Sequence, residues 1–241
     1  PAGRIAANGQ YELATTVEAG SSSSKVNLNS AITYAAWDST VVNLSDSFTI
    51  DLNAGGMPES EGDYDHWFYS ANSTTLFLYD GTFTLQPSSD PEAASALQAD
   101  LDIGGAAEFN SGTVGRRAYN EGTISSGTFQ GNVDNWSTIS NGTFLGNVNN
   151  WDTISNGTFQ GEVYNAGTIS NGTFQGTVGN CKTISGGTFE EVVEVYASSG
   201  TEAEIEGGTF EKGMTLKNND ASITIKDGLF DGEVVTEECN S

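Results

Sequence analysis

The sequence predicts an all-β protein: a parallel β-solenoid (β-helix) with short three-sided coils of about 15 residues in its C-terminal half and wider, irregular coils in its N-terminal half. Two observations support this directly: a motif recurs at a fixed spacing, and apolar residues alternate with polar ones inside each copy. The third is composition. Among 241 residues, only 36% are hydrophobic and 30 are glycine, which argues against a helical bundle and against a doubly wound enzyme fold.

The motif has the form Thr-Ile-Ser-Asn-Gly-Thr-Phe. Five copies follow one another at a constant spacing, beginning at Thr123, Thr138, Thr153, Thr168 and Thr183. A weaker copy begins at Glu108, two copies at longer spacing begin at Glu204 and Thr224, and an outlier begins at Phe77. Helical repeats need roughly 33 residues or more, so a unit of less than half that length indicates a coil of strands.

Each unit is predicted to contain three short strands. Thr-Ile-Ser is the first, and Asn-Gly then turns the chain because both residues tolerate positive φ. Thr-Phe-Gln is the second, followed by a turn at a glycine: Gly131, Gly146, Gly161 or Gly176. The third is Asn-Val-Asp or its equivalent, closed by a corner at residues 135–137 and their counterparts. Alternation with a period of two places Ile, Phe and Val inside the coil.

Stacking of coils buries the apolar residues that one coil cannot bury alone. At about 4.8 Å per rung, identical residues form columns of Ile, Phe and Val. A further column occupies a corner and consists of Asn135, Asn150, Asn165 and Asn180. Stacked asparagine amides satisfy one another and the backbone groups of the turns, as in other stacked β structures. The sequence leaves the handedness of the solenoid open.

The remaining elements complete the organisation of the chain. Four parts are predicted: residues 1–24 as a flexible lead or cap, 25–107 as irregular coils with loops, 108–236 as the regular β-solenoid repeats, and 237–241 as an acidic tail. The repeat length grows toward the C-terminus, as the later copies of the motif are more widely spaced. The loops fall at 55–73 and 84–100, and residues 92–98 of the second could form a short helix over the core.

Charge and cysteine content restrict the partners. Eight basic and 32 acidic residues give a net charge of −24, which argues against binding of nucleic acid and against insertion into or binding to an anionic membrane. Cys181 and Cys239 are expected to be several coils apart, hence unpaired thiols, unless the C-terminal tail folds back to bridge them. No cluster of Cys and His indicates a structural zinc site.

The pattern Thr-Ile-Ser-Asn-Gly-Thr-Phe-Gln-Gly-x-Val-x-Asn resembles repeats of large surface proteins of Gram-positive, often gut-dwelling, bacteria. The upstream stretch 25–53 looks like the start of the β-helix in such adhesin-type proteins, and the resemblance covers most of residues 25–235. It implies an extracellular, cell-surface or secreted β-helix that acts in adhesion, with a host or cell-surface glycan or protein as partner, or as a rigid stalk. The motif carries no functional residues to transfer. End-to-end self-association through open solenoid ends is a further possibility.

No catalytic residues are predicted. His66 is the only histidine, and no pair of carboxylates with a basic partner stands out, so the chain is expected not to be an enzyme; a carbohydrate-active β-helix enzyme is the less favoured alternative. No cofactor is expected. Metal ligands stay unknown, with calcium as a possible ion because acidic residues accumulate toward the C-terminus, from Glu190 to Glu206.

Aromatic residues form the two candidate ligand sites. Trp136 and Trp151 occupy the same corner of successive coils, with Tyr164 nearby, and such a pair could be a platform for a sugar ring or simply stack on itself. Asp65, His66 and Trp67 lie in the least repetitive loop, where carboxylates beside aromatics suit a sugar or a cation; packing of the aromatics on the solenoid is the alternative.

The threonine columns suggest a function of a different class. A surface array of Thr123, Thr138, Thr153, Thr168 and Thr183, each with serine at the second position after it, resembles the flat arrays of insect antifreeze proteins. Ice binding is therefore an alternative. The competing explanation is that threonine simply suits exposed strand positions.

Overall fold

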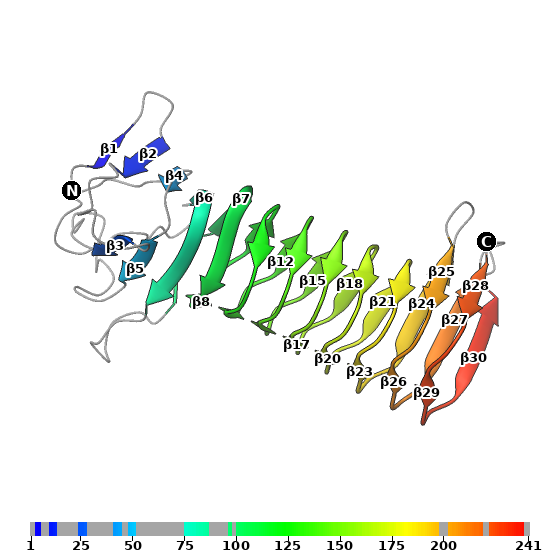
Figure 1. Cartoon of the computed structure of the whole chain (residues 1–241). Helices are drawn as coiled ribbons and strands as arrows, with labels where there is room; N and C mark the ends of the chain where they lie inside the picture. The colour runs from blue at the N-terminus through cyan, green and yellow to red at the C-terminus, as the bar shows by residue number, and fades with distance from the viewer. Residues whose placement is uncertain are drawn as a thin grey trace. The chain divides into compact units, whose positions relative to one another are not determined.

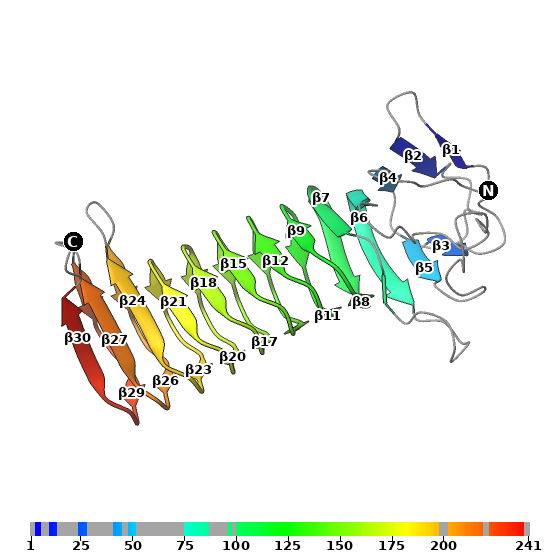
Figure 2. The same cartoon turned by 180° about the vertical axis from the view of Figure 1, so that it is seen from behind.

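The computed structural model describes residues 3–5, 10–13, 24–27, 41–44, 48–51, 75–86, 96–97, 100–197, 202–218 and 222–238. These residues form strands and turns without a helix, in two compact units, residues 1–131 and 132–241. In each unit parallel strands stack in successive coils, as Figures 1 and 2 show from opposite sides. Among the described residues, no helix is long and apolar enough to cross a membrane.

Long strands dominate the first unit. β6 (Thr75–Gln86) and β7 (Asp100–Ser111) pair in parallel along their length. Two short strands, β4 (Val41–Leu44) and β5 (Phe48–Asp51), pair with successive stretches of β6. These strands are the wider, irregular coils that the sequence predicts for this half.

Shorter strands complete the first unit. β2 (Gln10–Leu13) is parallel to β4, and β3 (Ser24–Asn27) is parallel to β5. β1 (Gly3–Ile5) pairs with β2 in the antiparallel sense. Residues 1–24, expected to be a lead or a cap, thus contain one antiparallel pair of strands.

The regular repeat begins within this unit. β9 (Ala118–Asn120) and β10 (Thr123–Ile124) both pair with β7, and β11 (Thr128–Phe129) pairs with β8 (Thr113–Val114). Leu97, at the end of the segment proposed as a short helix, forms a parallel bridge with Val114 instead. Ala96 and Leu97 are buried, so this end of the segment does cover the core, but not as a helix. Residues 92–95 lie outside the described part.

The second unit is a regular solenoid in which each coil supplies three strands. The first coil contains β12 (Val133–Asn135), β13 (Thr138–Ile139) and β14 (Thr143–Phe144). Each strand pairs in parallel with its equivalent in the next coil, so that Val133 lies opposite Val148 and Phe144 opposite Phe159. The next three coils repeat this with β15 (Val148–Asn150), β16 (Thr153–Ile154), β17 (Thr158–Phe159), β18 (Val163–Asn165), β19 (Thr168–Ile169), β20 (Thr173–Phe174), β21 (Val178–Asn180), β22 (Thr183–Ile184) and β23 (Thr188–Phe189).

The last coils are longer, in agreement with the wider spacing of the motif there. Their first strands are longer than those of the regular coils, and the parallel pairing continues without a shift of register. The strands are β24 (Val193–Ala197), β25 (Ala203–Ile205), β26 (Thr209–Phe210), β27 (Met214–Asn218), β28 (Ile223–Ile225), β29 (Leu229–Phe230) and β30 (Val234–Glu238).

The predicted columns form the core of the second unit. Ile, Phe and Val at equivalent positions are almost completely buried through the regular coils. The phenylalanines stack face to face, with 4.7 Å between the ring centroids of Phe144 and Phe159 and an interplanar angle of 4°. The stack continues through Phe174, Phe189 and Phe210 to Phe230. Burial of aliphatic and aromatic groups at every rung is what makes successive coils stable together.

The regular coils contain glycine in two of their turns, and the two glycines have different physical roles. Gly157 adopts a φ of +138°, which L-residues avoid, so the Asn-Gly turn uses glycine for its conformation. Gly161 has no such φ. A Cβ there would lie 2.4 Å from the carbonyl oxygen of Gly146, so this turn needs glycine because the preceding coil is too close.

The asparagine column is a buried hydrogen-bonded ladder. Asn135, Asn150, Asn165 and Asn180 have no exposed surface. The side-chain amide of each of the first three donates to the Oδ1 atom of the next, over 2.6 to 2.7 Å. The same amides donate to carbonyl groups in the turn ahead, such as that of Gly167 at 3.0 Å from Asn165. The ladder therefore fixes the corner as the sequence predicts.

Candidate functional site

The corner beside the asparagine ladder carries the tryptophan pair. The rings of Trp136 and Trp151 stack with centroids 4.1 Å apart and planes inclined by 7°. Trp136 is 54% exposed, the second most exposed of the large hydrophobic residues described. Each tryptophan directly follows a buried asparagine of the ladder, which holds its backbone firmly, although the Trp136 ring is exposed and the Trp151 ring is half-buried.

A second column of residues lies next to the asparagine ladder, at the second position of the strand that precedes each corner. It leads along the solenoid from the tryptophan pair to a pocket. The residues in register are Asp134, Asn149, Tyr164, Gly179 and Glu194. Asn149 donates a hydrogen bond of 2.8 Å to the nearly buried Asp134. Tyr164 is 44% exposed. Beyond it, Gly179 interrupts the column because it has no side chain.

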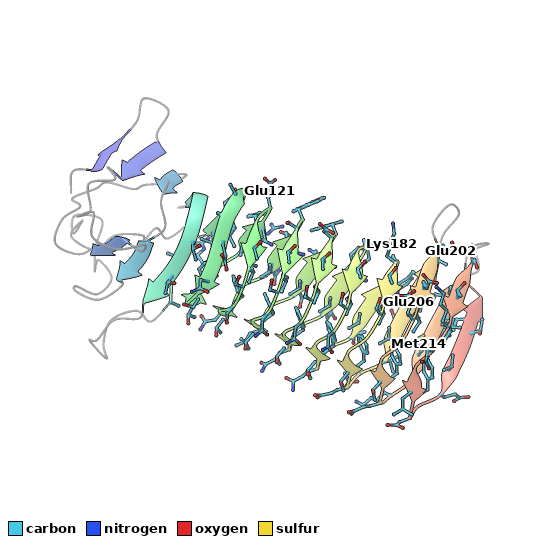
Figure 3. The ribbon with its side chains drawn as sticks, viewed as in Figure 1. Glu121, Lys182, Glu202, Glu206 and Met214 are labelled. Atoms are coloured by element: carbon cyan, nitrogen blue, oxygen red, sulfur yellow. The ribbon has the colours of Figure 1, made fainter. Side chains whose placement is uncertain are left out.

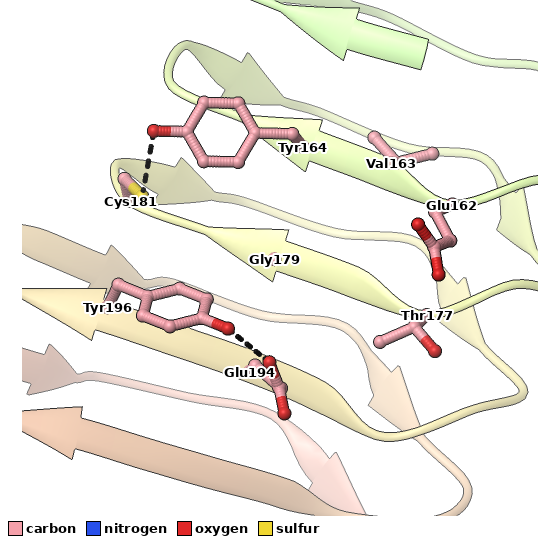
Figure 4. A pocket seen from close by; sticks show the side chains of 8 residues that line it. All are labelled: Glu162, Val163, Tyr164, Thr177, Gly179, Cys181, Glu194 and Tyr196. Atoms are coloured by element: carbon pink, nitrogen blue, oxygen red, sulfur yellow. Dashed lines mark hydrogen bonds between the residues drawn. The ribbon is translucent and has the colours of Figure 1, made fainter. Parts of the chain in front are cut away.

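The interruption at Gly179 creates a pocket of about 450 Å³ (Figure 4). Tyr164 lines one side, and Tyr196, from β24, lines the other. A Cβ added to Gly179 would lie 3.4 Å from Cε2 of Tyr196 and 3.9 Å from Cδ2 of Tyr164. Both rings are thus within van der Waals reach of any group that takes the place of the missing side chain.

Polar groups surround these rings. The Tyr196 hydroxyl donates to the Glu194 carboxylate, and the Lys217 ammonium donates to the same carboxylate at 2.8 Å. Lys217 also lies 5.2 Å from the centroid of the Tyr196 ring. Glu162 and Thr177 line the pocket on the side of Glu194, and at the other side Cys181 donates from Sγ to the Tyr164 hydroxyl oxygen over 3.4 Å (Figure 4).

These contacts alter the acid–base properties of the pocket. The hydrogen bond from Lys217, supported by that from Tyr196, lowers the pKa of Glu194, so this carboxylate is ionised at neutral pH. The bond to Glu194 raises the pKa of Tyr196, and the hydrogen bond shared with Cys181, together with burial, raises the pKa of Tyr164. Both phenols therefore stay protonated under physiological conditions and act as hydrogen-bonding groups.

The threonine array is present in the second unit. Thr138, Thr153, Thr168 and Thr183 lie opposite one another in register, each half-buried. The array ends where Glu204 takes the next position, and Ser185 donates to Glu206 over 2.9 Å. Figure 3 labels Glu206 among the side chains of these last coils. In the first unit, Thr123 lies opposite Glu108, so the array meets a carboxylate there too.

The remaining sequence predictions concern the loop around His66, metal ligands and the two cysteines. Asp65, His66 and Trp67 lie outside the described residues. Within the described ranges, no group of three or more His, Cys, Asp or Glu side chains is placed to hold a metal ion. Cys181 is a free thiol, as expected, whereas Cys239 falls beyond the described part.

Sequence reasoning found the tryptophan pair and Tyr164 but missed the pocket. Its centre, Gly179, is visible as the one glycine in the Val-x-Asn triplets of the regular coils. That signal was available. The approach of Tyr196 toward Gly179 was not, because it depends on the direction of a side chain.

No protein family model, curated protein or solved structure matches the chain. The fold is therefore established by the structure itself, and the function must be argued from the site.

Proposed function

We propose that the chain is a non-enzymatic module of an extracellular surface protein, of the kind its repeats resemble, and that it acts in adhesion by binding a glycan. The main observation in support is the Trp136–Trp151 stack, with Trp136 exposed and Trp151 half-buried, on a corner anchored by the asparagine ladder. Flat aromatic surface that is already ordered binds the apolar face of a sugar at low cost in conformational entropy. The stacked coils additionally serve as a rigid spacer that presents this surface.

The acid–base state of the pocket favours binding over glycoside hydrolysis. Most glycosidases need one carboxylic acid that is protonated near neutral pH, beside a second carboxylate. Glu162 and Glu194 share the pocket, but Lys217 and Tyr196 lower the pKa of Glu194. Glu194 is thus unsuited to be the general acid.

A glycan-array measurement, with and without calcium, tests the proposal. We expect saturable binding to at least one neutral glycan, weakened at least about tenfold in the Trp136→Ala/Trp151→Ala double variant, equivalent to about 1.4 kcal/mol. Leu145→Ala is the matched control, because Leu145 is also an exposed apolar residue of the second unit, at 43%. Absence of binding to every glycan would leave the spacer role and remove adhesion to sugars.

Ice binding is a second candidate because the threonines of the second unit form an ordered array over successive coils. Thermal hysteresis of the chain measures it directly. Thr153→Lys, within this array, should abolish the hysteresis. Thr158→Lys should not, because Thr158 belongs to a separate column in another sheet, formed by Thr143, Thr158, Thr173 and Thr188. A freezing point equal to the melting point in the unsubstituted chain would exclude this candidate.

A further inference from the structure

We propose that the pocket around Gly179 is a binding subsite for a single neutral hexopyranose residue, held between Tyr164 and Tyr196. This inference rests on the proposed glycan adhesion and adds to it a site distinct from the tryptophan stack. The pocket is the hollow that Figure 4 shows, with one tyrosine on each side of Gly179.

The glycine is not required by the local backbone. Gly179 lies in the middle of β21 and does not have a positive φ, unlike the turn glycines. A Cβ would meet no backbone atom there, only the two tyrosine rings at ordinary contact distance. Glycine is unfavourable inside a strand, and where neither conformation nor packing demands it, close approach of a ligand is a physical reason for it.

The aromatic walls are ordered before any ligand arrives. Tyr196 is held by its hydrogen bond to Glu194 and by Lys217, which binds that carboxylate and lies over the ring. Tyr164 is held at its hydroxyl by Cys181. A ligand therefore needs to immobilise neither ring, which lowers the entropic cost of binding.

The polar groups match a polyol better than an ion. The Tyr164 hydroxyl shares one hydrogen bond with Cys181 and, because a phenol both donates and accepts, it can form a second one with a ligand. The hydroxyl of Thr177 can donate or accept, and the carboxylate of Glu162 can only accept. A mixed set of donors and acceptors beside apolar rings complements sugar hydroxyls and C–H groups, as in typical small-ligand sites.

Charge then selects among sugars. Glu162 and Glu194 both line the pocket, and Lys217 compensates only one of them. In a chain of net charge −24, an acidic sugar such as a uronic acid would be repelled. The expected residue is therefore a neutral hexose or N-acetylhexosamine unit.

The test is an NMR titration of the whole chain that follows backbone amide signals. The probes are the methyl glycosides of glucose, galactose, mannose and N-acetylglucosamine, with glucuronic acid as the acidic probe and tetramethylammonium as a cationic one. We expect at least one neutral glycoside to shift the signals of Gly179, Cys181 and Tyr196 saturably. Glucuronic acid should bind at least about tenfold more weakly.

Gly179→Val provides the decisive variant because it places a branched side chain between the two tyrosine rings at a position without positive φ. It should weaken binding at least about tenfold while leaving the melting temperature unchanged or raised. Thr215→Val is the matched control, since Thr215 lies opposite Glu194 in the same column but does not line the pocket. It should bind as the unsubstituted chain does.

Each contrary outcome is distinguishable. Unchanged amide signals with every neutral glycoside, or equal affinity in Gly179→Val, overturn the inference. Binding of tetramethylammonium alone also overturns it and makes the pocket a cation site. If the glycan-array signal depends on the tryptophans but not on Gly179→Val, the proposed function stands and this inference fails. If the glycan-array signal is weakened by Gly179→Val but not by the tryptophan substitutions, the inference stands and the proposed role of the tryptophans fails.

Discussion

The side-chain amide of Asn150 donates to Oδ1 of Asn165 over 2.7 Å, and neither residue exposes any surface. The Asn150 amide also donates to the carbonyl of Asp152, and its Oδ1 accepts from Asn135. The side chain of Asn150 thus bonds to the asparagines of both neighbouring coils and to the turn of its own coil. The ladder links coils through side chains in addition to the backbone pairing.

Asn150→Ala should therefore destabilise the protein by about 2–4 kcal/mol, because it removes three hydrogen bonds of the corner, each worth roughly 0.5–1.5 kcal/mol. Chemical denaturation measures the free energy of unfolding. The control is Asn147→Ala on the same coil, whose exposed side chain accepts from the Glu162 amide and can be replaced by water. Equal losses in the two variants would contradict a special role for the buried ladder.

Alanine at two glycines should give opposite results. Gly157→Ala forces a Cβ into a backbone with φ of +138° and to 3.1 Å from the Gly142 carbonyl oxygen, so a loss of about 1–3 kcal/mol is expected. Gly179→Ala has neither problem, and the lower entropy of the unfolded chain should stabilise the protein by about 0.4–1 kcal/mol. The two free energies of unfolding check this; a similar loss at both positions would refute it.

The stability of the first unit should depend on the protonation of Asp102. Burial, and to a smaller extent Glu121, raises the pKa of Asp102 to about 6 from its ordinary 3.8. Tyr119 lies opposite Asp102, with the Arg117 guanidinium 4.5 Å from its ring centroid. Between pH 3.8 and 6 the folded chain retains a proton that the unfolded chain loses, so this contribution to stability falls as pH rises through that window.

Asp102→Asn removes the ionisation and should raise the melting temperature at pH 7.5, by about 2–4 °C for each kcal/mol recovered. At pH 3.5, where Asp102 is mostly protonated in both states, the variant should differ little from the unsubstituted chain. Calorimetry at the two pH values compares them. A variant equally stabilised at both would show that ionisation of Asp102 is not the cause.

Salt should raise the melting temperature because it screens a net charge of −24. The C-terminal glutamates are crowded in the sequence, but basic side chains partly compensate their charge in the structure. Lysines of the following coil pair with them, Lys212 with Glu191, Lys217 with Glu194, and Lys226 with Glu204 and Glu206. These surface pairs are worth about 0–1 kcal/mol each and do not remove the net charge.

Calcium should act here as an ordinary counterion. We expect calcium chloride and sodium chloride at equal ionic strength to raise the melting temperature by similar amounts. The physical reason for this expectation is that both cations screen the net charge of −24. A clear excess for calcium, saturating at low concentration, would instead establish a specific site.

The sequence alone was sufficient for the regular coils, and the reason is periodicity. With a constant repeat length and alternation of Ile, Phe and Val with polar residues, in-register stacking places like residues in columns, including the asparagines. The proximity of Trp136 and Trp151 on one corner followed from the same argument. Around Leu97, where the constant repeat is absent, local propensity suggested a helix, and Leu97 itself forms a parallel bridge to Val114 instead.

What only the tertiary structure decided is the pocket and the charge pairing. The sequence assigns Tyr164, Gly179 and Tyr196 to neighbouring coils, but not the direction in which each side chain lies. That direction depends on hydrogen bonds across coils: Tyr164 with Cys181, and Glu194 with Lys217. A repeat period determines which backbone positions are neighbours, whereas the rotamers on the exposed face are selected by the contacts that folding brings together.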